Sequence, residues 1–433
     1  MTERASQHLS DLGLFTGAPQ HENFCRMNEL VETLRMAPSS TPRTWETGAP
    51  IDLPETFEFM GQTLSSSELL TQTDTAALLV VKDGVIRHEQ YTLTGGPHVN
   101  WLSMSVAKSF ISALVGIALS EGLIGDIEEP ISKYVPVDPG SAYDGTAIRS
   151  VLQMSSGARW NEDYHDPNSD VARMGAATSG IGGTSHATVV ATMPREFPAD
   201  TICRYNSADT QALAMLLRHA TGQSVADYMQ TKLVEPLGFG DQGYWIVDPT
   251  GVEMGFGGLN LTARDYAAFG ELYRNGGEWN GTQIVPEDWV RVSTRSTAPH
   301  TAPGQPVLGS VRLPDGYGYQ WWLPAGVRGD FMAIGVYNQY VYVDPASAVT
   351  VVKLSANRAY GTAPDMSTNR DGEISAYLAA IAKSLVLPTL ENRLFLGQEG
   401  PDRVGVVGGR AESALRGGFR SQGIRERACG SVD

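Results

Sequence analysis

The segment from Ser105 to Leu119 is apolar on nearly every side, and it constrains the fold more than any other part of the chain. Large apolar side chains recur along it at helical spacing, namely Phe110, Ile111, Leu114, Val115 and Ile117. Gly122 ends the pattern, as a helix C-cap does. Because a helix that is apolar all round must be covered on several sides, we expect a central helix with other elements packed around it.

Strand patterns come from distant parts of the sequence. The run from Ala76 to Tyr91 predicts a hairpin at Asp83-Gly84, a dipeptide that tolerates the positive φ angles of a tight turn. A strand is predicted over 316–324 and a second hairpin over 337–355, with helices at 207–220, 263–274 and 375–385. The sequence therefore predicts an α+β fold (an α/β sandwich), in which helices flank an antiparallel sheet built from both ends of the chain.

The same patterns divide the chain into four parts. Residues 1–45, with helical hints between Glu22 and Met36, are expected to form an N-terminal arm that wraps over the surface. Residues 46–130 and 258–388 are assigned to the sheet domain, and residues 131–257 to an inserted all-helical subdomain. Residues 389–433 are rich in Gly, Arg and Ser and lack apolar periodicity, which predicts a disordered tail.

Charge and cysteine content restrict the partners. A net charge of −16 disfavours nucleic acid and anionic membranes, and neither a signal peptide nor a membrane span is apparent, so we expect a soluble, cytoplasmic protein. A small-molecule substrate is the expected partner, and a homodimer is left open. Cys25, Cys203 and Cys429 are too widely spaced for a disulfide framework or a metal cluster. Cys203 lies two residues before Tyr205, and a buried structural role is favoured for it over that of a reactive thiol.

Ser105 and Lys108 form an SxxK motif at the start of the central helix. Positions three apart share a helix face, so the hydroxyl and the amine are neighbours. A serine becomes nucleophilic when a base takes its proton, and burial lowers the pKa of a lysine toward that task. Free backbone N–H groups at the helix start would also stabilise an oxyanion. The alternative is a structural lysine whose amine reaches the surface.

Two further motifs follow in the order found in β-lactamases and penicillin-binding proteins, which the chain resembles. Tyr205-Asn206-Ser207 is similar to the Tyr-x-Asn element of class C β-lactamases and their esterase relatives, which implies that Tyr205 shuttles a proton beside Ser105. Ala333-Ile334-Gly335 occupies the place of Lys-Thr-Gly. The glycine permits close backbone approach, and the Val336 N–H would join that of Ser105 in an oxyanion hole. Without the lysine, a penicillin carboxylate has no anchor.

The resemblance is closest to the 6-aminohexanoate-dimer hydrolases and their carboxylesterase relatives, and it extends from about Pro54 to Leu387. The similar stretches are LSMSVAKS, GLIGDIEEPISKYVP, NEDYHDP, YNSADT, GGLNLTARDYA, QWW and VDPASAVTVVKLS. The resemblance implies a β-lactamase/transpeptidase-like fold without metal or cofactor. It also implies that Tyr164 closes over the substrate and hydrogen-bonds the leaving nitrogen. Ser207 stands where Tyr-x-Asn has its Asn, as in this branch.

Two departures from the branch concern the substrate. Val336-Tyr337-Asn338-Gln339 replaces the common His-Gly-Gln, so that Tyr337 and Asn338 are expected to form a bulkier wall. Gln339 and Trp321 of the QWW stretch are also assigned to substrate binding. The segment after Asp170 is interpreted as a Gly-rich loop without an acid to pair a substrate ammonium. Short-chain esters are therefore the expected best substrates.

The function predicted is a serine hydrolase that cleaves small esters or linear amides through an acyl-serine. The alternatives are a D-amino-acid peptidase or weak β-lactamase of the same fold, or an idle member that binds acyl ligands. An acidic turn at Glu162, Asp163 and Asp166 lacks a histidine pair for metal binding, so it is expected to be a solvated loop.

Overall fold

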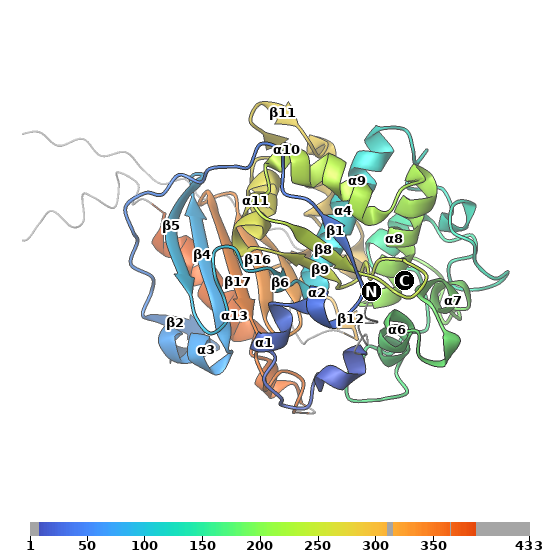
Figure 1. The fold of residues 1–433 in the computed structure, drawn as a ribbon, viewed down its shortest axis with the longest axis horizontal. Helices are drawn as coiled ribbons and strands as arrows, with labels where there is room; N and C mark the ends of the chain where they lie inside the picture. The colour runs from blue at the N-terminus through green and yellow to red at the C-terminus, as the bar shows by residue number, and fades with distance from the viewer. Residues whose placement is uncertain (1–7, 310–314, 364, 387–433) are drawn as a thin grey trace, which may run out of the picture. The chain divides into compact units, whose positions relative to one another are not determined.

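A seven-stranded antiparallel sheet forms the main layer of the computed structural model, which describes residues 8–309, 315–363 and 365–386 (Figure 1). Its strands, in spatial order, are β13 (Gly316–Tyr317), β14 (Trp322–Leu323), β15 (Phe331–Gly335), β16 (Gln339–Asp344), β17 (Val349–Ser355), β4 (Thr75–Lys82) and β5 (Val85–Tyr91). The pairing of β17 with β4 joins the two ends of the chain in one sheet, as the sequence predicts.

The predicted hairpin turn at Asp83-Gly84 is confirmed, with φ of 55° and 80°. The strand predicted over 316–324 is wrong, because β13 and β14 are two short strands joined by a turn. Gln320, at φ 66°, makes that turn, and its side-chain amide donates to the Leu152 carbonyl at 2.7 Å. This buried hydrogen bond holds the backbone out of the extended conformation.

The apolar central helix is confirmed as α4 (Ala107–Ser120), which follows a 3₁₀ turn, η2 (Met104–Val106). Every residue from Ala107 to Ala118 is buried. The Phe110 ring stacks on Phe269 with centroids 3.7 Å apart, and on another side α4 packs against α8. The helix is thus enclosed on several sides, as its composition requires.

Helices cover both faces of the sheet. α11 (Ala263–Arg274) packs on β16, β17 and β4, and α13 (Asp371–Ser384) lies with α3 (Ser66–Gln72) in a second apolar cluster. Alternate side chains of β4 point to opposite faces of the sheet, since Leu79 belongs to the main apolar core and Leu78 to the second cluster. α13 begins four residues before the predicted start, at Asp371.

Most helices between residues 131 and 257 are short and pack around α4 and α8. They are α5 (Ile148–Leu152), α6 (Asp170–Thr178), α7 (His186–Ala191), α8 (Ser207–Thr221), α9 (Val225–Met229) and α10 (Glu235–Leu237), with 3₁₀ or π turns at Ile131–Lys133, Ile181–Gly183 and Gln230–Val234. The expected loop after Asp170 is therefore wrong, because Ser169 caps α6 there. Residues 8–386 form one compact unit, and the division proposed within it stays a prediction.

The N-terminal arm is more integrated than expected. α1 (His21–Phe24) and α2 (Met27–Leu30) are helical, but β1 (Thr33–Met36) is a strand paired with β8 (Gly243–Ile246), which corrects the helical interpretation of that stretch. Burial of Phe24, Met27 and Met36 explains the difference, since these side chains belong to the main core. The predicted tail and Cys429 lie outside the described residues.

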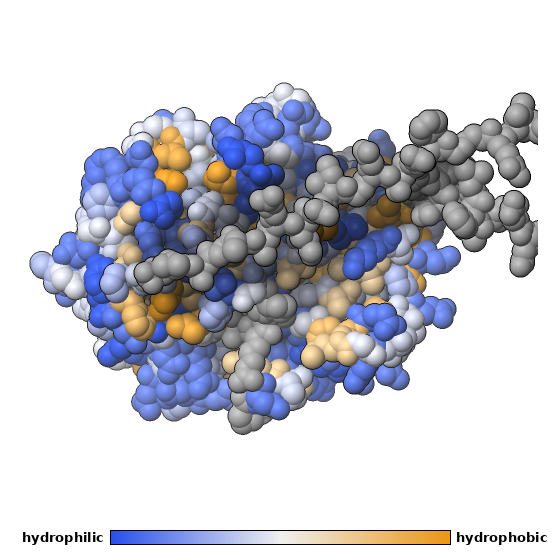
Figure 2. Space-filling view, turned by 180° about the vertical axis from the view of Figure 1, so that it is seen from behind, coloured by the Kyte–Doolittle hydropathy of each residue, from blue (hydrophilic) through white to orange (hydrophobic). Residues whose placement is uncertain are grey.

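The remaining elements are small and lie outside the seven-stranded sheet, and β6 and β9 join β1 and β8 in a second, four-stranded sheet. The strands are β2 (Thr56–Phe59), β3 (Gln62–Ser65), β6 (Trp101–Leu102), β7 (Cys203–Arg204), β9 (Leu259–Leu261), β10 (Glu278–Trp279), β11 (Thr282–Gln283) and β12 (Val307–Leu308). α12 (Glu287–Ser293) lies against α4, and 3₁₀ turns occur at Leu9–Leu12, Pro299–Thr301 and Ser367–Asn369. In Figure 2 the visible face is mainly hydrophilic with small, separate apolar patches. No helix in the described part of the chain has the length and apolar character to cross a membrane.

Gly116, in the middle of α4, gives a direct test of this packing. A Cβ added there would lie 2.4 Å from the Trp289 ring, so Gly116→Ala forces α4 and α12 apart. We expect a net loss of about 1–3 kcal/mol in the free energy of unfolding, although alanine favours helix. Urea unfolding measures it. Gly175→Ala in α6 is the control, since nothing lies within 4 Å of its added Cβ. Equal stability of Gly116→Ala and the wild type would contradict the packing.

Candidate active site

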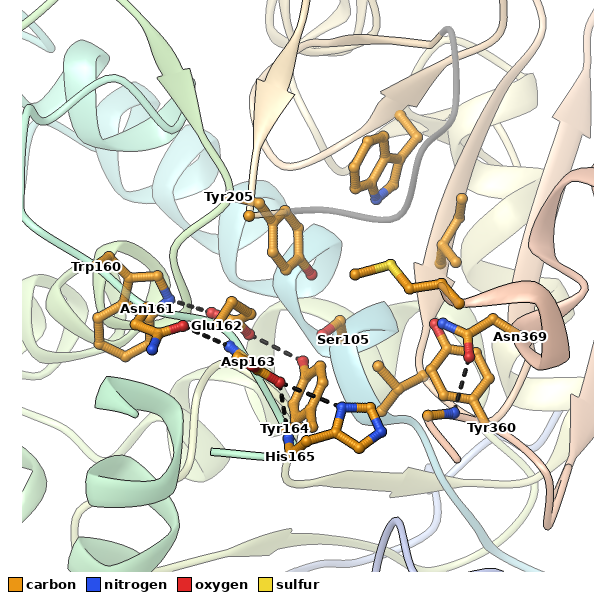
Figure 3. Close-up of a pocket in the computed structure, with 16 residues that line it drawn as sticks. Ser105, Trp160, Asn161, Glu162, Asp163, Tyr164, His165, Tyr205, Tyr360 and Asn369 are labelled. Atoms are coloured by element: carbon orange, nitrogen blue, oxygen red, sulfur yellow. Dashed lines mark hydrogen bonds and ion pairs between the residues drawn. The ribbon is translucent and has the colours of Figure 1, made fainter. Parts of the chain in front are cut away.

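Ser105 lies in η2, where the backbone turns into α4, and its side chain reaches two adjoining cavities. Lys108, one turn further, donates a hydrogen bond from Nζ to Ser105 Oγ at 2.8 Å. Figure 3 shows Ser105 between Tyr205 and Tyr164. The SxxK spacing thus brings the hydroxyl and the amine into direct contact.

Lys108 is almost completely buried, with 1% of its surface exposed. Its three donor positions meet Ser105 Oγ, Ser207 Oγ at 3.3 Å and the Phe256 carbonyl at 2.9 Å. Burial lowers the pKa of the Lys108 amine to about 8, against the opposing charge of Glu162, which raises this pKa. With a pKa of about 8, roughly a tenth of Lys108 is uncharged at pH 7 and able to accept a proton, and this fraction rises as the pH approaches 8.

Tyr205 follows β7, and its backbone N–H donates to the Leu308 carbonyl at 2.8 Å. Its ring stacks on Trp322 with centroids 5.5 Å apart, and Lys108 Nζ lies 4.9 Å from its centre. Burial raises the pKa of the Tyr205 phenol above its ordinary value, while a hydrogen bond with Ser105 acts in the opposite sense. Tyr205 is thus a neutral phenol beside the serine.

Glu162 is one of the site residues that sequence reasoning missed. The expected solvated loop is wrong at this position, because the Glu162 carboxylate is 6% exposed. It accepts hydrogen bonds from Ser207 Oγ at 2.6 Å and the Ser207 N–H at 3.1 Å. Figure 3 shows two more, from Tyr164 Oη at 2.9 Å and from Trp160. The flanking aromatics Trp160 and Tyr164 were the available signal of burial. Glu162 therefore links Tyr164 to the Ser207 hydroxyl that Lys108 contacts.

Gly335 brings the end of β15 against the backbone that carries Ser105. A Cβ at Gly335 would lie 2.5 Å from the Ser103 carbonyl oxygen and 3.0 Å from the Ser105 nitrogen, so only glycine fits. Val336 comes next and lines both cavities. The predicted oxyanion-hole residues, Ser105 and Val336, are thus at the same edge of the site.

The expected substrate contacts of Asn338 and Gln339 are not found, because neither residue lines the two cavities. Asn338 is fully buried and donates to Asp371 Oδ1 at 3.0 Å. Gln339 donates to the Ser355 carbonyl at 2.6 Å. Both side chains hold the turn between β15 and β16 from inside, which corrects their assignment to substrate binding.

Tyr337 and Trp321 also differ from the prediction. Trp321 is fully buried and packs against Tyr273 and Phe331, whereas its neighbour Trp322 lines the cavity and stacks on Tyr205. Tyr337 is 1% exposed and lies behind the cavity wall. Strand alternation explains the exchange between the two tryptophans, since adjacent residues point to opposite faces.

The two cavities differ in the charged side chains that line them. One, of about 420 Å³, is lined by polar and aromatic residues that include Trp160, Asn161, Glu162, Asp163, Tyr205 and Asn369. The other, of about 380 Å³, is mainly apolar. Both contain Ser105, Tyr164 and Val336, so the nucleophile candidate lies where they meet.

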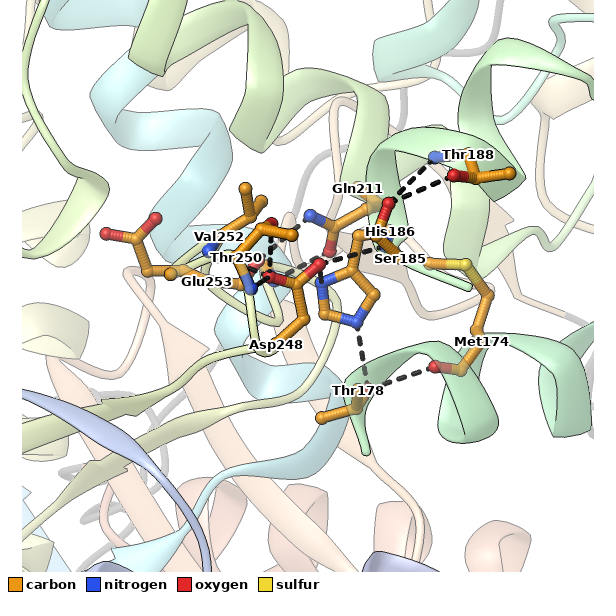
Figure 4. A network of polar contacts seen from close by, with 12 residues as sticks. Met174, Thr178, Ser185, His186, Thr188, Gln211, Asp248, Thr250, Val252 and Glu253 are labelled. Atoms are coloured by element: carbon orange, nitrogen blue, oxygen red, sulfur yellow. Dashed lines mark hydrogen bonds and ion pairs between the residues drawn. The ribbon is translucent and has the colours of Figure 1, made fainter. Parts of the chain in front are cut away.

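A buried polar network fixes α6, which forms one wall of the apolar cavity. His186 Nε2 and Thr178 Oγ1 are 2.8 Å apart, and the His186 N–H donates to Asp248 at 3.0 Å (Figure 4). Burial lowers the pKa of His186 to about 4, so the ring is neutral at physiological pH. The end of α6 is thereby tied to the turn at Asp248. Cys203 is also buried, which raises its thiol pKa to about 12 and agrees with a structural role.

A serine paired with a buried lysine, beside an antiparallel sheet flanked by helices, is typical of serine hydrolases with the β-lactamase fold. The beta-lactamase family model matches residues 67–372. The chain is 32% identical over 291 residues to the 6-aminohexanoate-dimer hydrolase of Paenarthrobacter ureafaciens, covering 66% of this chain and 74% of that protein.

Two solved structures have the same fold. A Bacillus anthracis protein with a suggested 6-aminohexanoate-dimer hydrolase activity has a TM-score of 0.75 at 22% identity, over 89% of this chain and all of the other. A D-stereospecific amidohydrolase from Streptomyces has a TM-score of 0.52 at 13% identity, over 71% of this chain and 93% of the other.

The chain therefore belongs to the β-lactamase family and is a serine hydrolase. Its expected fold and its likeness to 6-aminohexanoate-dimer hydrolases are both confirmed.

Proposed function

We propose that this hydrolase cleaves small esters and linear amides through an acyl-enzyme on Ser105. The observation that carries the proposal is the 2.8 Å contact between Ser105 Oγ and a buried Lys108 whose pKa is about 8. Such an amine can take the hydroxyl proton at neutral pH, which is what a serine needs in order to attack a carbonyl carbon.

In the acylation step, Ser105 Oγ bonds to the carbonyl carbon while its proton passes to Lys108. The backbone N–H groups of Ser105 and Val336 stabilise the oxyanion. Collapse of the tetrahedral intermediate breaks the bond to the leaving group, which takes a proton from the Tyr205 phenol. Lys108 then passes the proton that it took from Ser105 to Tyr205, which restores the neutral phenol and the uncharged amine. Water repeats the sequence on the acyl-serine to release the acid.

Tyr164 is proposed to assist amide cleavage. Its hydroxyl donates to Glu162 and lines both cavities, so it can turn to a leaving nitrogen. Amides depend on such help more than activated esters, because an amine leaves only when it is protonated. The absence of a lysine before Gly335 disfavours penicillins. Amide activity is supported by the name of the Paenarthrobacter relative.

The nucleophile assignment predicts the behaviour of three variants. Ser105→Ala is expected to lose turnover and labelling by a fluorophosphonate probe. Lys108→Ala and Tyr205→Phe are expected to lower kcat at least ~10²-fold, the scale of general acid–base catalysis. Ser112→Ala, on the same helix and away from both cavities, is the control and should retain activity. Full labelling of Ser105→Ala would refute the assignment.

The pH profile should report the protonation of Lys108. Because the uncharged amine is the base, kcat/KM is expected to rise with pH and level off above about 8. Glu162 raises the pKa of Lys108, so Glu162→Gln should move this rise to lower pH. Asp166→Asn, on the same loop but without a hydrogen bond to Ser207, is the control. A rise that moves to higher pH in Glu162→Gln would contradict the electrostatic account.

Substrate ranking gives a separate prediction. We expect kcat/KM to fall from nitrophenyl esters to linear amides and then to penicillins and cephalosporins. A missing charge-assisted contact costs on the order of 1.5–3 kcal/mol, or roughly ten- to hundredfold in kcat/KM. Tyr164→Phe should slow amides more than esters. The ranking fails if a cephalosporin is cleaved faster than nitrophenyl butyrate.

A further inference from the structure

The N-terminal arm crosses one side of the active site. At one end the Leu9 N–H donates to Ser179 Oγ, at the C-cap of α6, at 3.2 Å. At the other end the Phe15 N–H donates to Tyr337 Oη at 2.6 Å, beside the turn between β15 and β16. The segment 9–15 thus connects two elements that are far apart in sequence and that both border the Ser105 site.

Phe15 is held in an unusual conformation by its neighbours. Its φ of 61° lies in the left-handed region, which is unfavourable for a side chain of this size. Its ring stacks on Tyr164, with centroids 4.4 Å apart and planes at 22°, and lies 5.1 Å from the Tyr337 ring. Such strain persists only where surrounding contacts impose it, and here they place Phe15 directly on a residue that lines both cavities.

None of the side chains that line the cavity beneath this segment carries a charge. Its apolar lining consists of Leu9, Leu14, Phe15, Met104, Pro167, Val171, Ala172, Ala176, Ile181, Met254, Phe256 and Val336. Among its described lining residues, the side-chain polar atoms are the hydroxyls of Ser105, Ser207 and Tyr164, and the first two are already bonded to Lys108. A charged group placed here would therefore find no lining side chain of opposite charge to offset its loss of hydration.

We propose that segment 9–15 is a specificity element, which closes the apolar cavity over an uncharged aliphatic chain on one side of the scissile bond. This rests on the proposed function and sharpens its substrate class. Three residues of the arm supply part of the wall, and α6, expected from the sequence to be an open loop, supplies another. Among esters, the preferred substrates therefore carry a longer chain than acetyl.

The test compares two homologous ester series in the full-length enzyme. One lengthens the acyl chain, from nitrophenyl acetate to butyrate and hexanoate, and the other lengthens the alcohol, from ethyl to butyl and hexyl acetate. In one series kcat/KM should rise by up to about fourfold per methylene, the equivalent of about 0.8 kcal/mol per buried CH₂. Phe15→Ala should reduce the ratio of the longest to the shortest substrate about four- to fifteenfold, which corresponds to one or two methylenes left uncovered.

Two further variants separate the cavity wall from general packing. Leu12→Ala removes a buried side chain of the same segment that does not line the cavity, so it should keep the ratio. Ala176→Phe fills the cavity while the arm stays intact, so it should lower the ratio even if Phe15→Ala folds poorly. The proposal is overturned if neither series depends on chain length, or if folded Phe15→Ala and Ala176→Phe both keep the wild-type ratio. Loss of the proposed function would look different, because no ester would then show turnover that depends on Ser105.

Discussion

The burial of the Lys108 amine beside Ser105 is the interaction on which the rest of the site depends. A charged amine inside an apolar helix is costly, and here the cost appears as a lowered pKa instead of an ion pair. Ser105, Ser207 and the Phe256 carbonyl satisfy its three donor positions. Glu162 lies one hydrogen bond further out, on Ser207, and so moderates the pKa shift without forming a direct ion pair. The same burial that stabilises α4 therefore sets the basicity that the serine requires.

Distant segments converge on this pair because each is fixed by its own buried polar contacts. Asn206 caps α8 directly after Tyr205 and donates to Asp209, whose carboxylate also accepts from Tyr143. Asn338 and Gln339 hold the turn after Gly335 from behind. His186 ties α6 to the turn at Asp248 (Figure 4). None of these side chains lines the two cavities, yet each fixes an element that borders them. The N-terminal arm then covers the apolar side through Phe15 and Tyr164.

Local sequence was sufficient to predict those features that depend only on residues close together in the chain. The SxxK spacing predicted the contact between Ser105 and Lys108, and the apolar pattern predicted α4, because both depend on neighbours within one helix. What could not be predicted depends on contacts between distant residues. Trp321 and Trp322 are adjacent and alike, and only the face of the sheet to which each side chain points decides which one reaches the cavity. Glu162 resembles a solvated acid until Ser207 and Tyr164 surround it. The arm contains no catalytic motif, so its contact with Tyr164 emerges only from the fold.

The most direct test of the account is the pKa of Lys108 itself. In protein with ¹³C-labelled lysine Cε, an NMR titration of the free enzyme would follow the Lys108 resonance, assigned by its absence in Lys108→Arg. That assignment also separates it from Lys353, a second buried lysine whose pKa is lowered to about 7. The account predicts a midpoint near 8 for Lys108, with a resonance of the uncharged amine above that pH. A Lys108 that remains protonated beyond pH 10, as an exposed lysine does, would contradict its role as the base that activates Ser105.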